Sequence, residues 1–215
     1  MPEEDKPRRP YRSERRREGA ALTRQRILDA ASKRFVDQGY AGTTIASIAA
    51  DAGTAAETVY ATFGSKVAVL EAVVRGAARG NEEAEIPEQA GPARVAATTD
   101  PRQLLRLFAA DVVERLERVG PLLVVLAHAA ASEPSLADLY RRLHEARLQN
   151  LRTIATMLAQ RKALRVGEDE AAETVWALAS PELHTLLTRL RGWSRERYIT
   201  WLADTLAGAL LPAPR

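Results

Sequence analysis

The residues that could carry catalysis or bind a metal ion are few, and their spacing suits neither role. The three histidines, His128, His144 and His184, do not stand at metal-ligand spacing with each other or with a glutamate. Acidic pairs such as Asp111 and Glu114 fall on amphipathic segments, where they are typical of a solvated face. The sequence has no cysteine, which excludes disulfides, thiolate catalysis and cysteine-based metal sites. We therefore predict that the chain is not an enzyme and has no catalytic residues, metal ion or cofactor.

The distribution of charge favours contact with nucleic-acid phosphates. Residues 1–66 hold 12 Lys and Arg against 9 Asp and Glu, whereas residues 67–215 hold 19 of each, so the net charge of +3 lies in the first part. Residues 1–19 have no apolar periodicity, which predicts a disordered arm. This arm carries Arg8, Arg9, Arg12, Arg15, Arg16 and Arg17. It either contacts phosphates or the minor groove of DNA, or it is a solvated tail.

The stretch from Thr23 to Lys66 predicts three short helices and the start of a fourth. Apolar residues at spacings of three to five predict a first helix over about residues 22–38, with Leu22, Ile27, Ala30, Ala31 and Phe35 on its inner face. Gly39 follows and can take the positive φ that ends a helix. Thr44 is a good N-cap for a second helix over residues 45–52.

A tight turn at Ala52-Gly53 joins the second predicted helix to the third. Thr54 and Glu57 have the spacing of a capping box, which predicts a third helix over residues 55–63. Ser65 caps a fourth helix over residues 66–79. Two helices joined by so tight a turn form a helix-turn-helix, which places its second helix in the major groove of DNA.

This stretch resembles the DNA-binding domain of the TetR family of bacterial regulators. Residue types and spacings agree across four elements, at Arg26-Ile27-Leu28-Asp29-Ala30-Ala31, Phe35, Gly39-Tyr40, Thr43-Thr44, Ile48-Ala49, Ala52-Gly53, Thr58-Val59-Tyr60, Phe63 and Ser65-Lys66. The alternative is a small three-helix bundle with no DNA role, in which all these positions would agree by chance.

The resemblance implies roles for individual residues. Thr44, Ser47, Tyr60 and Lys66 would bond DNA phosphates, Lys66 together with the first amides of its helix. Thr58 and the exposed face of the third helix would meet the bases. The predicted DNA-binding set is Thr43, Thr44, Ala46, Ser47, Thr54, Ala55, Ala56, Glu57, Thr58, Tyr60, Ala61 and Lys66.

This reading surface is poor in polar side chains. Ala46, Ala56 and Ala61 stand where other TetR-family members often carry longer polar residues, so the methyl groups of Ala and Thr would contact thymine methyls. Glu57 either accepts a bond from a cytosine amine or, as we favour, serves only as a capping carboxylate. Part of the sequence specificity would then depend on DNA shape.

The rest of the sequence predicts an all-α body over residues 67–215, after an arm over residues 1–19 and a helix-turn-helix domain over residues 20–66. The acidic run, prolines and glycines of residues 80–100 predict a long, mobile linker. Helices are then expected over residues 101–119, 121–131, 135–162, 168–190 and 195–210, and Ser194 is the N-cap of the last one. Pro181 should kink the helix over residues 168–190 or divide it. No transmembrane span or secretory signal is evident, so we expect a cytoplasmic protein.

The resemblance implies that the body dimerises through its last two long helices. The apolar residues there exceed what one side of a helix pair needs, and we assign Trp176, Leu183, Leu186, Leu187, Trp201, Leu202 and Leu206 to a homodimer interface. The alternative is that all of them belong to the intrachain core. A two-fold dimer would double the contacts with a palindromic operator.

The resemblance also implies a pocket for a small effector in the body. Our candidates are large or polar-tipped residues on mostly buried helices, namely Phe108, Val112, Leu126, His128, Tyr140, His144, Met157 and Trp176. Core packing is the favoured alternative for Phe108 and Met157, and a hydrogen-bonded core histidine for His128. A mostly apolar pocket would suit a hydrophobic or aromatic effector.

These features together predict a homodimeric, ligand-responsive transcriptional regulator. We expect a repressor that leaves its operator, a double-stranded DNA site, when the effector binds. One alternative is an activator or a ligand-independent regulator of the same fold. Another is a helical protein–protein adaptor that no longer reads DNA.

Overall fold

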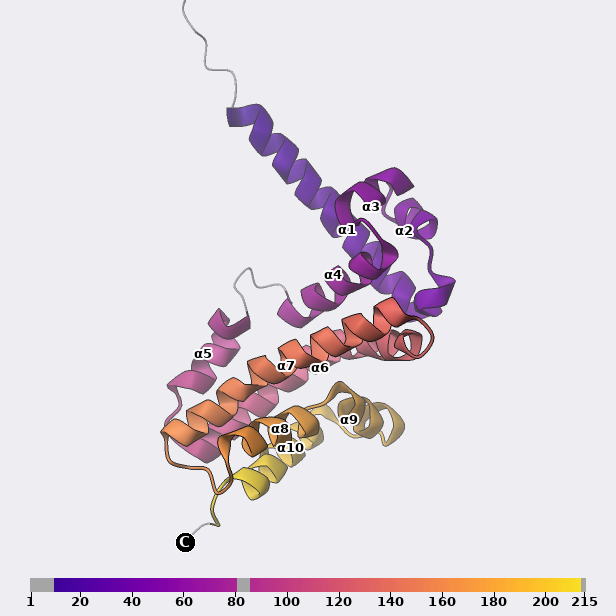
Figure 1. Cartoon of the computed structure of the whole chain (residues 1–215). Coiled ribbons are helices and arrows are strands. Elements are labelled where there is room, and N and C mark those ends of the chain that lie inside the picture. The colour runs from indigo at the N-terminus through magenta and orange to yellow at the C-terminus, as the bar shows by residue number, and fades with distance from the viewer. Residues whose placement is uncertain (1–9, 81–85, 214–215) are drawn as a thin grey trace, which may run out of the picture. The chain divides into compact units, whose positions relative to one another are not determined.

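The computed structural model describes residues 10–80 and 86–213, except for the side chains of residues 10–16 and 87. The described residues form helices and no strand, which confirms the all-α prediction (Figure 1). The chain divides into two compact units, Met1–Val73 and Val74–Arg215. None of the described helices is long and apolar enough to cross a membrane.

The first unit has the predicted order of helices. They are α1 (Pro10–Gly42), α2 (Ile45–Asp51), α3 (Ala56–Phe63) and the first half of α4 (Lys66–Arg79). Their inner faces meet in a small core of fully buried side chains, which includes Ile27, Ala31, Phe35, Ile48, Val59, Val69 and Leu70. The Ser65 hydroxyl accepts a bond from Ala68 N–H (3.1 Å) and caps α4, as predicted.

α1 is longer than predicted at both ends. It begins at Pro10, so the prediction of a disordered arm is wrong for residues 10–19, whereas residues 1–9 of that arm lie outside the described residues. Arg and Glu have high helix propensity, and residues 11–19 contain no proline, so the helix can extend towards the N-terminus. α1 bends at Gly39, whose φ of 70° favours glycine, before it ends at Gly42.

The capping box lies one helix earlier than predicted. The box predicted for Thr54 and Glu57 is wrong, because Ala55 is the N-cap of α3 and no side chain caps its first turn. At the start of α2, Thr44 Oγ1 accepts from Ser47 N–H (3.0 Å), and Ser47 Oγ accepts from Thr44 N–H (3.1 Å). A serine takes the place of the usual Glu or Gln, so the sequence pattern did not reveal this box.

The second unit is a set of helices around one apolar core. After α4 come η1 (Ile86–Glu88), α5 (Ala90–Ala97), α6 (Pro101–Ala130), α7 (Pro134–Gln160), α8 (Glu168–Leu178), α9 (Pro181–Thr185), the π-helical segment η2 (Leu186–Leu190) and α10 (Arg195–Leu210). α6 packs along α7 and α10, and α8 packs against α7 (Figure 1). The core between them buries side chains such as Leu105, Leu158 and Tyr198. Ser194 caps α10 as predicted.

The predicted mobile linker contains a packed helix, so that prediction is wrong for residues 86–100. Val95 of α5 is buried in the core of the body. Gln89 is buried as well, and its Nε2 donates to Arg79 O (2.9 Å) while its Oε1 accepts from Arg115 Nη1 (2.6 Å). A single valine among alanines gave no periodic signal, and the role of Gln89 depends on partners far away in the sequence.

Pro121 does not separate two helices as predicted, because α6 runs through it from Pro101 to Ala130. An internal proline removes one helical hydrogen bond and costs about 3 kcal/mol. Buried apolar side chains on both sides, including Leu116, Leu122 and Leu126, offset this loss, since each contributes about 1.5–3 kcal/mol. The apolar face therefore continues across the proline.

Pro181 divides the predicted helix over residues 168–190. α8 ends at Leu178, and the Ser180 hydroxyl accepts from Leu183 N–H (3.1 Å) to cap α9, of which Pro181 is the first residue. A π-helical turn then follows, with Arg191 N–H donating to Leu186 O (3.1 Å). The chain therefore changes direction twice between α8 and α10.

Replacing Gln89 tests whether the segment after α4 is part of the folded body. Gln89→Leu would leave Arg79 O and Arg115 Nη1 without this partner, and we expect unfolding in urea to show a loss of about 1–3 kcal/mol. The exposed Gln103 supplies the control, since Gln103→Leu should change stability by no more than about 0.5 kcal/mol. Equal stability of the two variants would contradict a structural role for Gln89.

Candidate nucleic-acid interface and effector site

Backbone bonds across the turn fix the start of α3 relative to the end of α2. Gly53 N–H donates to Ala50 O (3.2 Å), and Thr54 N–H donates to Ala49 O (3.0 Å). Gly53 has a φ of 61°, where a side chain would strain the backbone. This is the geometry that a helix-turn-helix needs to present its second helix.

An ion pair joins α1 to the end of α2. Arg34 Nε and Nη2 bond the two carboxylate oxygens of Asp51 at 2.5 and 2.8 Å. The hydrogen bond from Arg34 holds the pKa of Asp51 below its usual value, so the carboxylate stays charged. Two parallel bonds from a planar guanidinium restrict orientation as well as distance. The pair therefore orients α2 against α1.

The outer face of α3 is exposed and carries most of the predicted reading residues. Tyr60 is 53% exposed, Glu57 and Ala61 are also exposed, and Thr58 is half-buried. Val59, on the opposite side, is fully buried and anchors the helix. The face presents one phenol, one carboxylate and several methyl groups, which suits phosphate contact and thymine methyls better than a dense set of base hydrogen bonds.

The hydroxyls of Thr44 and Ser47 differ in what they can offer to a phosphate. Thr44 Oγ1 accepts from Ser47 N–H, so its own hydrogen remains to be donated. Ser47 Oγ already donates to Thr44 O (2.8 Å). Thr44 can therefore bond a phosphate without breaking the cap, whereas Ser47 would have to rotate.

Thr43 and Lys66 hold the loop between α1 and α2. Thr43 is fully buried and donates to Gly39 O (2.8 Å), so it cannot contact DNA in this conformation and we remove it from the interface. Lys66 Nζ donates to Tyr40 O and Thr43 O, both at 2.9 Å, and lies 3.9 Å from the centroid of the Tyr40 ring. The ammonium has three donors, so at least two of them stabilise the fold.

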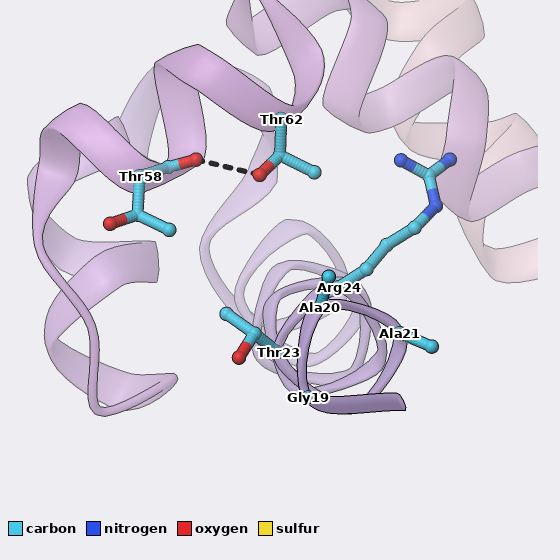
Figure 2. A pocket seen from close by; sticks show the side chains of 7 residues that line it. All are labelled: Gly19, Ala20, Ala21, Thr23, Arg24, Thr58 and Thr62. Atoms are coloured by element: carbon cyan, nitrogen blue, oxygen red, sulfur yellow. Dashed lines mark hydrogen bonds between the residues drawn. The ribbon is translucent and has the colours of Figure 1, made fainter. Parts of the chain in front are cut away.

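An open hollow of ≈ 440 Å³ lies between α1 and α3 (Figure 2). Gly19, Ala20, Ala21, Thr23 and Arg24 of α1 form one wall, and Thr58 and Thr62 of α3 form the other. The Arg24 guanidinium lies over the Phe63 ring, 4.4 Å from its centroid. Arg12, Arg15, Arg16 and Arg17 precede this wall on α1, so this part of the arginine-rich segment belongs to a helix that borders the reading helix. Nothing in the apolar periodicity pointed to this hollow.

The predicted pocket residues divide into three groups in the structure. Phe108, Val112 and Leu126 are buried in packed helix faces, and Met157 packs against the core. His128 is exposed, so placing it in the core or in a pocket is wrong. Its neighbours on α6 are apolar, but His128 lies on the outer side of the last turn. A short run that is apolar on nearly every side does not indicate which of its residues face outward. Tyr140, His144 and Trp176 come together.

Tyr140, His144 and Trp176 form an aromatic cluster between α7 and α8. The Tyr140 and His144 ring centroids are 4.2 Å apart, and those of His144 and Trp176 are 5.7 Å apart. Glu182 of α9 accepts a bond from Tyr140 Oη (3.0 Å) and lies 3.8 Å from His144 Nε2. Burial lowers the pKa of His144, so its neutral form is favoured.

Arg147 completes this cluster and was not predicted. Its Nη2 donates to Trp176 O (2.7 Å) and Ala179 O (2.6 Å) at the C-terminal end of α8. Burial lowers its pKa to about 10, which still leaves it charged at neutral pH. Tyr140, His144 and Arg147 follow at intervals of four and three residues, the spacing of one helix face, and this was the signal available in the sequence.

The residues assigned to the dimer interface differ in how far they are buried within the chain. Leu202 and Leu206 are fully buried inside the chain, so a second copy cannot contact them in this conformation. Leu186 of η2 is 48% exposed, and Leu190, which was not in the predicted set, is 74% exposed. Leu183, Leu187, Trp176 and Trp201 are half-buried. The exposed apolar surface therefore gathers around η2 rather than along α10.

Known proteins share this fold. Residues 27–73 match the model described as bacterial regulatory proteins, tetR family. The predicted resemblance to the TetR family is confirmed. NalD of Pseudomonas aeruginosa, the secondary repressor of the MexAB-OprM multidrug efflux pump, is a similar structure with a TM-score of 0.69 and 20% identity, over 92% of this chain and 100% of its own. TetR-family regulators are DNA-binding proteins and not enzymes, and their model matches residues 27–73 of this chain.

Two further solved structures are similar over most of both chains. A protein from Rhodococcus sp. described as a TetR-family transcriptional regulator has a TM-score of 0.67 and 17% identity, over 88% of this chain and 99% of its own. A transcriptional regulator from Saccharomonospora viridis, solved in complex with choline, has a TM-score of 0.65 and 21% identity, over 88% and 98%. No curated protein matches the chain. At these identities the similarity establishes the fold, and the roles of single residues depend on the geometry above.

A buried histidine makes the stability of the body depend on pH. His184 is 7% exposed, and its ring meets Tyr198 edge-on at 4.9 Å. Burial lowers the pKa of His184, so the folded state resists its protonation. The unfolded chain takes up the proton near pH ~6.5, so stability should be full above that pH and fall as the pH drops below it.

The expected result is a free energy of unfolding that decreases from pH 7 to pH 5, with a smaller decrease in His184→Phe. His128→Gln is the control, because His128 is exposed and no burial is lost with it. Urea unfolding at several pH values measures this. An identical pH dependence in the parent and in His184→Phe would show that His184 is not responsible.

Proposed function

We propose that the protein is a homodimeric transcriptional repressor that a small effector releases from its operator. The main support is α3, which follows a Gly53 turn, is anchored by the buried Val59 and exposes Tyr60 on its outer face. This is the arrangement by which a helix-turn-helix meets the major groove. Because its target is bacterial DNA, we place the protein in the cytoplasm.

Phosphate contacts would position the helix, and few base contacts would specify the sequence. The Thr44 hydroxyl and the Tyr60 phenol are exposed donors, and the first amides of α3 have no side-chain cap. Ala46, Ala56 and Ala61 add methyl surface only. Operators with a defined groove shape and thymines at the contacted positions would then be preferred.

Removing the Tyr60 hydroxyl tests the proposed contact with a DNA phosphate. Tyr60→Phe keeps the ring and removes one hydroxyl, so it should weaken binding about fivefold and to a similar extent on every duplex, as expected for a phosphate bond worth about 1 kcal/mol. Fluorescence anisotropy with labelled DNA flanking the protein's own gene measures this. Tyr198→Phe in the core of the body is the matched control and should bind DNA like the parent.

Lys66 is a poor probe of DNA contact, because its loss would also release Tyr40 O and Thr43 O. If Tyr60→Phe binds every duplex as the parent does, the proposed contact is wrong. If the parent binds no duplex at all, the helical adaptor becomes the better description.

A second copy of the chain would cover the exposed leucines of η2. Leu186 and Leu190 lie on a segment between α9 and α10, with the half-buried Leu183 and Leu187 beside them. Apolar side chains gathered on one surface are typical of homodimer interfaces. Two reading helices held by such a dimer would bind two half-sites of a palindrome.

A charged side chain placed on this surface tests whether the surface forms the dimer interface. Leu190→Glu should shift the protein to the monomer in sedimentation velocity, because a carboxylate would be buried without a partner. Leu22→Glu is the control, since Leu22 is 65% exposed in the first unit and should leave the mass unchanged. A dimer that persists in Leu190→Glu would place the interface elsewhere.

The effector step has support from similar structures and from the cluster at His144. NalD is a repressor, and the Saccharomonospora viridis regulator was solved with choline. An effector that binds more tightly to the conformation unable to fit DNA would release the operator. An operator complex that no added compound weakens would favour a ligand-independent regulator, and an operator upstream of the promoter would favour an activator.

A further inference from the structure

The cluster between α7, α8 and α9 contains buried polar atoms that make no hydrogen bond with any described residue. They are Arg147 Nη1, Trp176 Nε1 and both ring nitrogens of His144. Buried polar groups in native proteins almost always have a partner, in the protein, in water or in a ligand. Four such atoms at one place are therefore a sign of a bound molecule.

These atoms lie together where α7 packs against α8. His144 and Arg147 are one turn apart on α7, and each faces the Trp176 ring of α8, at 5.7 Å between centroids for His144 and at 5.5 Å from the Arg147 guanidinium carbon. The His144 side chain is 14% exposed, whereas Tyr140 is half-buried and Glu182 is exposed. A molecule could therefore enter from the side of Tyr140 and Glu182.

The balance of donors and acceptors indicates what the molecule must offer. Arg147 Nη1 and Trp176 Nε1 can only donate, and a neutral His144 adds one donor and one acceptor. The Glu182 oxygen that lies 3.8 Å from His144 Nε2 already accepts from Tyr140. The cluster therefore has more hydrogen-bond donors than acceptors. A water molecule would add two donor hydrogens along with its acceptor oxygen, whereas a carboxylate adds acceptor oxygens only.

Charge and shape agree with this choice. Arg147 is held by two carbonyl oxygens, which are neutral, and burial lowers its pKa more than the Glu182 carboxylate raises it. Charge-assisted bonds to a planar guanidinium fit a carboxylate well. The rings of Tyr140, His144 and Trp176 offer apolar faces to the rest of the molecule.

We propose that the cluster of Tyr140, His144, Arg147 and Trp176 binds an aromatic carboxylate, with the carboxylate on Arg147 and Trp176 and the ring against the aromatic side chains. The inference builds on the proposed function, because this carboxylate would be the effector. It also adds a carboxylate to the sequence-based expectation of a hydrophobic or aromatic effector.

Isothermal titration calorimetry with the full chain tests the inference, using benzoate, phenylacetate and 1-naphthoate as probes. At least one should bind with one site per chain, and about tenfold more tightly than its amide, because the amide lacks the charge that Arg147 recognises. Equal affinity for acid and amide would overturn the proposal. So would the absence of saturable binding by all three acids, which would mean that water alone fills the cluster.

A conservative variant ties the binding to these residues. Trp176→Phe keeps an aromatic ring and removes the Nε1 donor, so it should weaken the best carboxylate about fivefold. Trp193→Phe is the matched control, since Trp193 packs on Trp201 and Arg197 instead, and it should bind like the parent. Unchanged binding in Trp176→Phe, with a folded circular dichroism spectrum, would overturn the proposed site.

The operator complex separates this inference from the proposed function. If a carboxylate binds but leaves DNA binding unchanged, the site is real and the induction step fails. If another class of compound releases the DNA while no carboxylate binds, the repressor mechanism is supported and the carboxylate site is refuted.

Discussion

The reading helix exists because one side of it is buried. α3 has eight residues, and a helix that short is unstable alone in water, since nucleation costs more than a few hydrogen bonds return. Val59 supplies the apolar anchor, and the bond from Thr54 N–H to Ala49 O fixes where the helix starts. The exposed side of α3 is therefore free to carry whatever residues recognition requires, and here it carries small ones.

Polar groups are used differently in the two units. In the first unit, Arg34, Thr43 and Lys66 each bond a specific partner and hold the helices and the loop in place. In the second unit, His144 and Arg147 keep buried nitrogen atoms without a partner among the described residues. Fully paired polar groups rigidify a structure, whereas unpaired ones cost free energy unless a ligand meets them. The first pattern suits a rigid reading surface, and the second suits a binding site.

The sequence predicted what local patterns determine. The caps at Thr44, Ser65 and Ser194 and the turn at Gly53 each follow from residues within one helical turn. It failed where distant contacts decide. The helix at α5 depends on packing of Val95, and α6 continues through Pro121 because both flanks are buried. The roles of Thr43, Lys66 and Arg147 depend on carbonyl groups that no side-chain pattern reveals.

α4 is anchored at both ends by such carbonyl contacts. Its first residue, Lys66, donates to Tyr40 O of α1 and to Thr43 O in the loop before α2. Carbonyl oxygens of its last turn accept from side chains of the body: Ala77 O from Arg118 Nε (3.2 Å), Ala78 O from Arg115 Nη1 (3.4 Å) and Arg79 O from Gln89 Nε2 (2.9 Å). Cationic donors at a helix C-terminus also match its dipole. Because Arg115 and Arg118 belong to α6, a shift of that helix would act on α4 through specific bonds rather than through loose apolar contact. In the proposed repressor, an effector in the body would act on α4 through these bonds.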